Sequence, residues 1–299
     1  MKKTGFIAIV GRPNVGKSTL LNALCGEKIA IVSKKPQTTR NRITGILTKG
    51  ENQFVFMDTP GMHRAKNKLG DYMMKAANST IRSVDAAILV ADTSYAPGEI
   101  EISIIEKLKR ADIPVMLVLN KTDKSDAVGI AKSIKSYSEL CDFASVVPIC
   151  ALKGEGVDIV LEEAEKFLLE GDWFFPEDEI TDQPERQIAA EIVREKMLRL
   201  LDDEIPHGVA VVIEEFTESP KMISIRAEIF CERETHKRII IGKQGETLKK
   251  IGTYAREDME TFFGTKIFLD LWVKVKENWR ESDFLVANFG YKKDPDEDL

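Results

Sequence analysis

Hydrophobic residues in the first half of the chain form short runs that alternate with longer segments of helical periodicity. Apolar runs typical of buried strands occur at residues 6–10, 54–57, 115–119 and 145–149. Residues 98–111 predict a helix whose apolar face holds Ile100, Ile104, Ile105 and Leu108. Residues 157–169 predict another, with Ile159, Val160, Ala164, Phe167 and Leu168 on its face. This alternation predicts an α/β unit over residues 1–170, with a mostly parallel sheet and helices on both faces.

The second half of the chain has a different order of elements. It predicts a helix over 185–201, two strands over 209–216 and 222–231, a glycine loop, a long helix and a strand over 267–275. Prolines and acidic residues at 171–184 indicate a linker. We therefore expect an α+β domain over 185–299, ending in an acidic, disordered tail at 294–298.

A phosphate-binding loop is predicted where the first apolar run ends. The pattern G-x-x-x-x-G-K-S places backbone N–H groups around an anion at the start of a helix. Its members are Gly11, Asn14, Val15, Gly16, Lys17, Ser18 and the following Thr19. Lys17 is expected to reach the β- and γ-phosphates, and Ser18 to bind Mg²⁺. The alternative is a simple glycine turn between a strand and a helix.

Two further segments predict groups that respond to the γ-phosphate. Asp58, at the end of the run 54–57, is expected to hold Mg²⁺ through water, and Gly61 to offer its N–H to the γ-phosphate. Residues 30–42 lie where a first switch belongs, so either Thr38 or Thr39 should bind Mg²⁺. Residues 61–83 would form the second switch. The expected catalytic residues are Lys17, Thr39 and Gly61.

Guanine is the base that the next motif predicts. Asn120, Lys121 and Asp123 follow the run 115–119, and the Asp123 carboxylate can accept hydrogen bonds from guanine N1–H and N2–H₂. Adenine lacks that pair of donors. Another segment, Cys150, Ala151 and Leu152, is expected to offer the Ala151 N–H to guanine O6. An N-K-x-D sequence can also be a helix-capping turn.

These motifs together resemble the translation-factor-related GTPases and, within them, the Era family, over nearly the whole chain. The related T-R pattern favours Thr39, which precedes Arg40, as the switch threonine. The family usually has Ser where this chain has Cys150, so the hydrogen bond that tightens this loop is in question. Met62 replaces the water-orienting Gln of many GTPases, which predicts slow intrinsic GTP hydrolysis. The resemblance implies a K⁺ bound by Asn14; the alternative for Asn14 is a polar loop residue bonded to backbone.

An RNA-binding loop is predicted in the second half. The G-x-x-G sequence and its flanks have the K-homology layout, in which a glycine loop clamps RNA backbone. The candidate residues are Ile241, Gly242, Lys243, Gln244, Gly245, Lys249 and Lys250. Basic residues outnumber acidic ones between 236 and 280, as a nucleic-acid face requires. A K-homology fold used only to dock protein is the alternative.

The order helix–strand–strand–helix–strand resembles the type II K-homology domain of the Era family. That resemblance implies that the RNA is the 3′ end of 16S ribosomal RNA and that the task is assembly of the small (30S) subunit. It also implies a peripheral membrane association, although the chain shows no lipid anchor or basic amphipathic segment. We expect a monomer.

Composition limits the remaining possibilities. A net charge of −6 and a pI near 5.4 argue against tight non-specific binding to polyanions, so recognition of a short single strand is favoured. The 4 cysteines are scattered and the histidines lack ligand spacing, which indicates a reducing cytoplasm and no zinc site. A P-loop kinase or ATPase is opposed by Asn120 and Asp123. A tRNA-modifying GTPase is opposed by the lack of that group's C-terminal cysteine motif.

Overall fold

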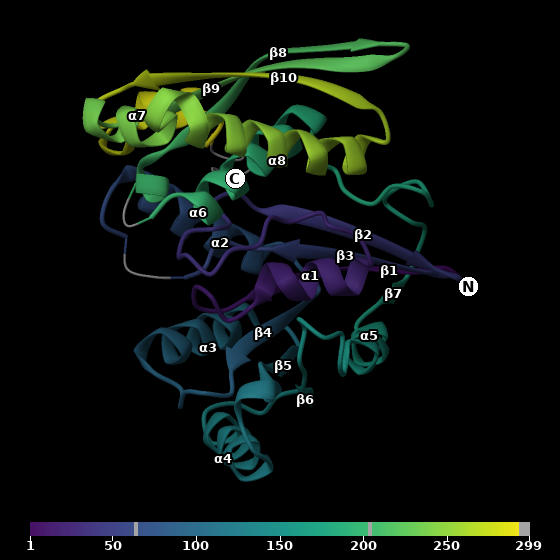
Figure 1. The fold of residues 1–299 in the computed structure, drawn as a ribbon. Coiled ribbons are helices and arrows are strands. Elements are labelled where there is room, and N and C mark those ends of the chain that lie inside the picture. Colours follow the sequence, from purple (N-terminus) through teal and green to yellow (C-terminus); the bar gives the residue numbers. More distant parts are fainter. Residues whose placement is uncertain (63–64, 203–204, 293–299) are drawn as a thin grey trace. The chain divides into compact units, whose positions relative to one another are not determined.

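A computed structural model describes residues 1–62, 65–202 and 205–292, and its described residues form two compact units (Figure 1). The first comprises residues 1–62, 65 and 71–182. The second comprises residues 66–70, 183–202 and 205–292. His63 and the predicted acidic tail lie outside the described residues.

The first unit is built on a sheet with the strand order β2-β3-β1-β4-β5-β6, and β7 pairs with β1. Neighbouring strands are parallel except at β2, which is antiparallel to β3, and at β7. The strands are β1 (Lys3–Val10), β2 (Ile43–Lys49), β3 (Asn52–Asp58), β4 (Ala86–Asp92), β5 (Val115–Asn120), β6 (Ser145–Pro148) and β7 (Leu169–Glu170). Its helices are α1 (Lys17–Cys25), α2 (Lys68–Arg82), α3 (Glu99–Ala111), α4 (Ala127–Ser138) and α5 (Val157–Glu165).

Helices cover both faces of this sheet because its strands are apolar on both sides. Ile7 and Ile9 belong to a core cluster with residues of α1 and α5, whereas Ala8 and Val10 belong to a cluster with residues of α2, α3 and α4. Successive residues of a strand point to opposite faces, so one uninterrupted run fills two cores. The predicted fold class is confirmed. The segment expected to form the second switch, 61–83, contains α2.

Three predicted details of the helices in this unit were wrong. Ile100 and Ile159 are exposed, at 38% and 47%, because the buried faces are centred on Glu101 in α3 and on Val160 in α5. The helix expected over 157–169 ends at Glu165. There the N–H groups of residues 166–168 bond to carbonyls three residues back, which tightens the turn and sends the chain into β7.

The segment expected as a linker is hydrogen-bonded to the first unit along much of its length. Gln53 is buried in β3, and its side chain bonds to the backbone of Phe174 and Phe175. Further along, the Ile46 N–H of β2 donates to the Ile180 carbonyl at 2.9 Å. The two units are divided between residues 182 and 183.

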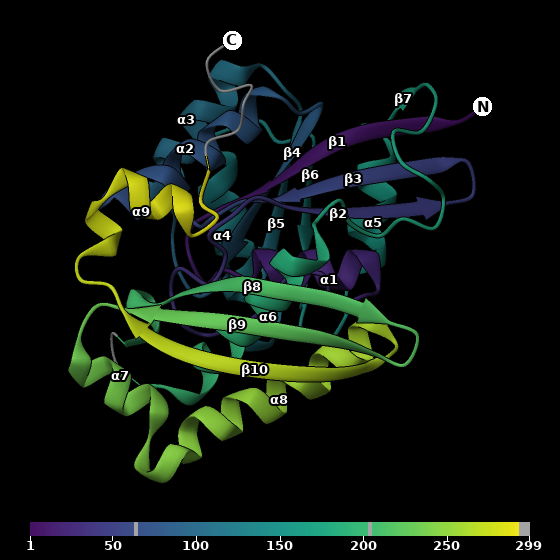
Figure 2. The ribbon, with the colours of Figure 1, turned by 90° about the horizontal axis from the view of Figure 1, so that it is seen from above.

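The second unit is an α+β domain with a three-stranded sheet in the order β10-β9-β8 (Figure 2). Its elements are α6 (Glu185–Leu200), β8 (Ala210–Ser219), β9 (Met222–Cys231), α7 (Glu234–Ile241), α8 (Glu246–Phe263), β10 (Lys266–Val275) and α9 (Asp283–Asn288), with short 3₁₀ turns at Ile205–Gly208, Lys243–Gly245 and Trp279–Glu281. β9 is antiparallel to β8 and parallel to β10. Residues of α6, α8 and one face of the sheet share a core that includes Ile192, Ile225 and Met259.

The order of elements in this unit differs from the prediction by two helices, α7 and the C-terminal α9. The apolar run Ile239–Ile241, expected only to lead into the glycine loop, forms the end of α7. Only Ile240 of this helix is buried. A helix that buries one residue does not need a long apolar stripe, so its sequence lacks the periodic signal that would predict it. The K-homology unit therefore runs helix–strand–strand–helix–helix–strand, followed by α9.

Candidate functional site

The phosphate-binding loop lies between β1 and α1. β1, β3, β4 and β5 are parallel, so their carboxyl ends meet at one edge of the sheet and bring Asp58, Asp92 and Asn120 toward this loop. Gly16 precedes α1 with φ 105°, and a Cβ built on it would lie 2.2 Å from Asn120 Nδ2. Only glycine both adopts this positive φ without strain and leaves room for the Asn120 side chain.

Lys17 is buried at the start of α1. Its ammonium donates to the carbonyls of Gly11 and Arg12 at 3.2 and 3.1 Å. Burial lowers the pKa of Lys17 to about 8, although the nearby Asp58 carboxylate acts in the opposite direction. The lysine charge is therefore held on loop carbonyls, at the point where phosphate oxygens are expected. Thr19 follows on the same helix.

Ser18, Thr39 and Asp58 come from three different elements and meet. Ser18 Oγ lies 2.6 Å from Asp58 Oδ2 and 2.8 Å from Thr39 Oγ1, and Thr39 Oγ1 lies 3.3 Å from the same Asp58 oxygen. Thr38, the alternative threonine, donates instead to the Lys35 carbonyl at 2.6 Å. The structure thus places Thr39 with the other two expected Mg²⁺ ligands.

The chemistry of this cluster suits Mg²⁺. All three side chains offer oxygen atoms, which Mg²⁺ prefers, and the buried Asp58 Oδ1 has no hydrogen-bond partner among the described residues. Burial raises the pKa of Asp58 to about 6, against the opposing effects of Lys17, Ser18 and Thr39. Within the described chain, His, Cys, Asp and Glu residues form no group of three or more suited to a metal. A site at Asp58 would therefore depend on hydroxyl groups and on ligands from the nucleotide.

The start of the second switch packs directly against the phosphate-binding loop. A Cβ built on Gly61 would come 2.7 Å from Pro13 Cα, so a larger residue would displace the loop. The N–H of Met62 donates to the Gly11 carbonyl at 3.2 Å, and its side chain is 2% exposed within the hydrophobic core. Met62 therefore points away from the place where an attacking water would lie.

Asn120 connects two loops of the expected guanine site. Its Nδ2 donates to the Val15 carbonyl at 2.8 Å, and its Oδ1 accepts the N–H of Ala151 at 3.0 Å. In this structure the Ala151 N–H, which is expected to bind guanine O6, is therefore bonded within the protein. A side-chain acceptor from the neighbouring loop already binds it.

The side chains next to Asn120 are also engaged. Lys121 donates to the Asn14 carbonyl at 2.6 Å and to Asp92 Oδ2 at 2.7 Å. The buried Cys150 thiol lies 3.3 Å from Asp123 Oδ1 and donates to it, so a hydrogen bond stands where the family has a serine. Leu152 is 83% exposed beside this loop.

Asp92 was missed by the sequence analysis. Burial alone would raise its pKa, but hydrogen bonds from Lys121 and Ser94 outweigh that effect and lower it. A signal was available, because Asp92 ends an apolar strand in the same way as Asp58 and Asn120.

The glycine loop of the second unit connects α7 to α8. Gly242 has φ 75°, and a Cβ there would lie 2.2 Å from Thr247 Oγ1, so the tight turn excludes larger residues. Gln244 and Gly245 also have positive φ. Ile241, Gly242 and Gly245 are half-buried, whereas Lys243 and Gln244 are exposed.

The cations at this loop differ from three others of the unit in their pairing with acids. Lys243, Lys249 and Lys250 are exposed, and in the described residues none has an acidic partner within 4.0 Å. By contrast, three other cations of the region pair with acids: Arg256 with Glu260, Lys274 with Glu228 and Arg280 with Glu232. The exposed, unpaired basic residues of this unit therefore include three at the glycine loop and the first turns of α8.

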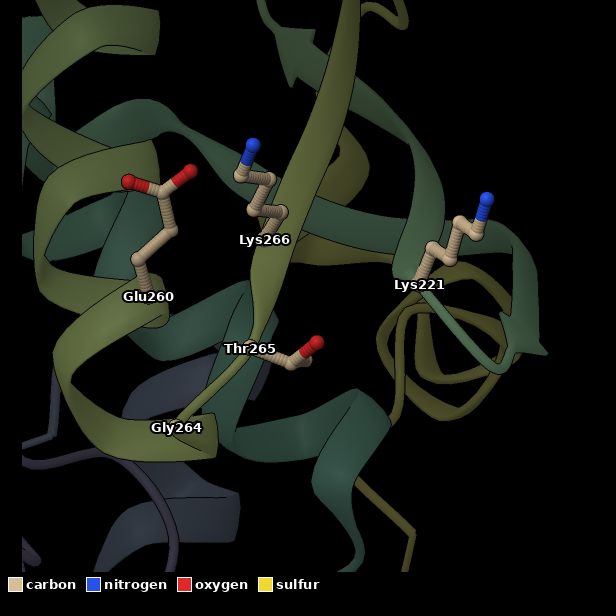
Figure 3. A pocket seen from close by; sticks show the side chains of 5 residues that line it. All are labelled: Lys221, Glu260, Gly264, Thr265 and Lys266. Atoms are coloured by element: carbon tan, nitrogen blue, oxygen red, sulfur yellow. The ribbon is translucent and has the colours of Figure 1, made fainter.

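A shallow pocket of about 600 Å³ lies at the other end of α8, lined by Lys221, Glu260, Gly264, Thr265 and Lys266 (Figure 3). α8 has 18 residues, which separates this pocket from the glycine loop by about 27 Å. Both Glu260 oxygens are engaged, by the Ile267 N–H and by Arg256. The helix end that it faces disfavours anions. We assign it no part in the RNA site.

Comparison with known proteins agrees with this geometry. Residues 6–121 match a family described as 50S ribosome-binding GTPase, and residues 204–280 match the KH domain. The chain is 52% identical to GTPase Era of Ruminiclostridium cellulolyticum, over 97% of this chain and 98% of that one. It is 51% identical to GTPase Era of Clostridium botulinum strain Kyoto, over 98% and 99%.

Two solved structures are similar over almost the full chain. One is Era in complex with MgGDPNP and nucleotides 1506 to 1542 of 16S ribosomal RNA, with a TM-score of 0.95, 40% identity and coverage of 98% of this chain and 100% of that one. The other is a substituted Era of Aquifex aeolicus bound to GDP·AlF₄⁻, with a TM-score of 0.94, 41% identity and coverage of 97% and 100%.

Fold and site together define a P-loop GTPase joined to a K-homology domain. The chain belongs to the Era family of GTPases. In the parts of the chain that the structure describes, no helix is both long enough and apolar enough to cross a membrane.

Proposed function

We propose that this chain is a GTP-hydrolysing switch that binds single-stranded RNA through its second unit, and that the RNA is the 3′ end of 16S ribosomal RNA in the small subunit. The observation that carries this is the meeting of Ser18, Thr39 and Asp58 beneath the phosphate-binding loop. It joins a residue of the first switch to two groups suited to Mg²⁺. The solved Era complex with MgGDPNP and 16S ribosomal RNA supports both halves of the proposal.

In this proposal Ser18, Thr39 and Asp58 hold the Mg²⁺ of the bound nucleotide. The ion neutralises charge on the β- and γ-phosphates. Lys17 keeps the two loop carbonyls as partners and directs its remaining N–H toward phosphate oxygens, and Gly61 offers its N–H to the γ-phosphate. Asp123 accepts the guanine N1–H and N2–H₂ groups, and the Cys150 thiol orients its carboxylate. ATP lacks both donors and is rejected.

We propose slow intrinsic GTP hydrolysis because the side chain after Gly61 is the buried Met62, which cannot orient water.

We also propose that a K⁺ binds near Asn14. Asn14 lies in the phosphate-binding loop with φ 65°, its carbonyl accepts a hydrogen bond from Lys121, and the residue is exposed. Turnover measured in K⁺ and in Na⁺, for wild type and Asn14→Ala, tests this part. Equal rates in both salts would reject it.

The glycine loop clamps the RNA backbone in this proposal. Gly242 and Gly245 let phosphates approach the main chain, and Lys243, Lys249 and Lys250 supply unpaired charge. Membership of the Era family supports two further parts of the proposal: a role in assembly of the small ribosomal subunit and a location in the cytoplasm. Peripheral membrane association stays a prediction, and flotation with vesicles of anionic lipid would test it.

Calorimetry with GTP, GDP and ATP, followed by titration of an RNA with the sequence of the 16S 3′ end, tests the whole proposal. We expect binding of GTP and GDP but not ATP, and tighter RNA binding with a non-hydrolysable GTP analogue than with GDP. Coupling is reciprocal, so RNA should tighten the GTP analogue by the same factor. The proposal would be overturned if ATP bound as tightly as GTP, or if the RNA affinity were the same with the GTP analogue and with GDP.

A further inference from the structure

The first residue after Gly11 ties the phosphate-binding loop to helix α3. Arg12 Nε lies 3.2 Å from Glu101 Oε1, and the Arg12 guanidinium carbon lies 4.4 Å from the centre of the Tyr95 ring. The Glu101 side chain is 4% exposed and that of Arg12 is 25% exposed. The ion pair is therefore largely shielded from water and from salt.

Glu101 is itself held in a defined position. Its second carboxylate oxygen, Oε2, accepts the N–H of Gly98 at 3.1 Å at the start of α3. A carboxylate in the first turn of this 13-residue helix is also favoured by the helix dipole. Burial and the Glu101 carboxylate together raise the pKa of Tyr137 in α4. Both oxygens of Glu101 thus have a fixed donor.

Arg12 links this carboxylate to the lysine of the phosphate-binding loop. Its side chain binds Glu101, while its main-chain carbonyl accepts the Lys17 ammonium at 3.1 Å. The Arg12 peptide group is therefore one of the two, with that of Gly11, whose carbonyls fix where the buried Lys17 charge lies. Arg12 is not among the loop residues that are expected to touch phosphate, and Tyr95 and Glu101 lie outside the loop.

We propose that Arg12, Glu101 and Tyr95 form a brace that positions Lys17 for contact with the β- and γ-phosphates of GTP. The three are positioning residues that act through the Arg12 carbonyl. This inference rests on the proposed function, since it concerns how the same site holds GTP. Lys17 reaches both phosphates of GTP but only the β-phosphate of GDP, so the brace favours GTP more than GDP.

The experiment is calorimetry of Glu101→Gln, Arg12→Gln and the double variant in full-length protein, with a non-hydrolysable GTP analogue and with GDP. We expect each single variant to weaken the analogue about tenfold and GDP by about twofold or less, a change of about 1.4 kcal/mol for the analogue. Because both residues act through one contact, the double variant should be no weaker than the worse single variant. Tyr95→Leu should have a smaller effect.

The matched control is the pair Glu163 and Lys166 on α5 and the turn after it, 2.6 Å apart and with Lys166 65% exposed, where the corresponding glutamine variants should change neither affinity. Thermal unfolding monitors folding, and Arg12→Lys, which keeps the charge but loses the planar fork, replaces any variant that fails to fold. Equal losses for GDP and the analogue, additive losses in the double variant, or no loss would overturn the brace. Wild-type protein that binds neither nucleotide would instead overturn the proposed function.

Discussion

Lys17 in the first unit and Lys243 in the second are both expected to meet phosphate, yet they are held differently. The Lys17 ammonium is buried and bonded to two loop carbonyls, whereas Lys243 is exposed and, among the described residues, unpaired. A buried charge needs partners before the ligand arrives, because unpaired burial is costly. An exposed charge is stabilised by hydration and does not need such partners. The nucleotide site is therefore organised in advance, and the RNA site depends on backbone shape and long-range attraction.

This difference has a consequence for specificity. In the first unit the groups expected to read the nucleotide are held by hydrogen bonds within the protein, as Asn120 is by the Val15 carbonyl and the Ala151 N–H. A wrong base then leaves buried polar groups unpaired, which gives strong discrimination. In the second unit the loop approaches the RNA backbone closely and its lysines contribute charge, so sequence must be read by contacts to the bases themselves.

The largest expected effect comes from the centre of the organised site. Asp58→Asn keeps the size of the side chain but removes the charge that would hold Mg²⁺, and we expect Mg²⁺-dependent GTP hydrolysis to fall by about a hundredfold or more. Phosphate release measured against Mg²⁺ concentration checks this. Asp126→Asn, which keeps the cap of α4, is the control. Full activity in Asp58→Asn would contradict the Mg²⁺ site.

The matching change in the second unit is Gly242→Asp. A side chain at φ 75° and within 2.2 Å of Thr247 Oγ1 must distort the clamp, so RNA affinity should fall about tenfold or more while GTP affinity stays the same. Lys243→Gln leaves the turn intact and should weaken RNA only a few-fold, with a shallower salt dependence. Lys274→Gln, which alters a cation paired with Glu228, is the control. Unchanged RNA binding in folded Gly242→Asp would favour a protein-docking role.

The pH dependence separates the two sites in the wild-type protein. The pKa of Asp58 is raised to about 6, and only the carboxylate form binds Mg²⁺. The affinity for Mg²⁺ should therefore be constant between pH 7 and 8 and fall about tenfold by pH 5, as the proton competes. Titration of Mg²⁺ into the nucleotide complex at each pH measures this. RNA binding to nucleotide-free protein should stay flat, and a parallel decline would point to general unfolding.

The smallest expected effect concerns the hydrogen bond between the Cys150 thiol and Asp123. Cys150→Ser replaces a thiol donor 3.3 Å from Asp123 with a hydroxyl, a stronger donor, and should tighten GDP about twofold to threefold. Cys150→Ala removes the donor and should weaken GDP by a similar factor. RNA affinity should be the same in both. If Cys150→Ala bound GDP more tightly than Cys150→Ser, the thiol would not be the group that orients Asp123.

Much of this organisation was predictable because it is local. The sequence G-x-x-x-x-G-K-S after an apolar run implies a turn before a helix, and the apolar runs ending in Asp58 and Asn120 imply parallel strands with their ends at one edge. Helix α7 was not predictable in the same way, since a single buried residue, Ile240, leaves no periodic signal. The early end of α5 depends on pairing between β7 and β1.

The sequence by itself determined the identity of both sites, because each motif carries its own backbone geometry and its own chemistry. Only the tertiary structure decided which loop atoms bond to one another. It placed Thr39 rather than Thr38 beside Ser18, engaged the Ala151 N–H with Asn120, and joined Arg12 to Glu101. These partners lie far apart along the chain, and no local pattern constrains them. Their pairing follows from the closure of the sheet and its helices, which brings buried polar groups together and requires each to find a partner.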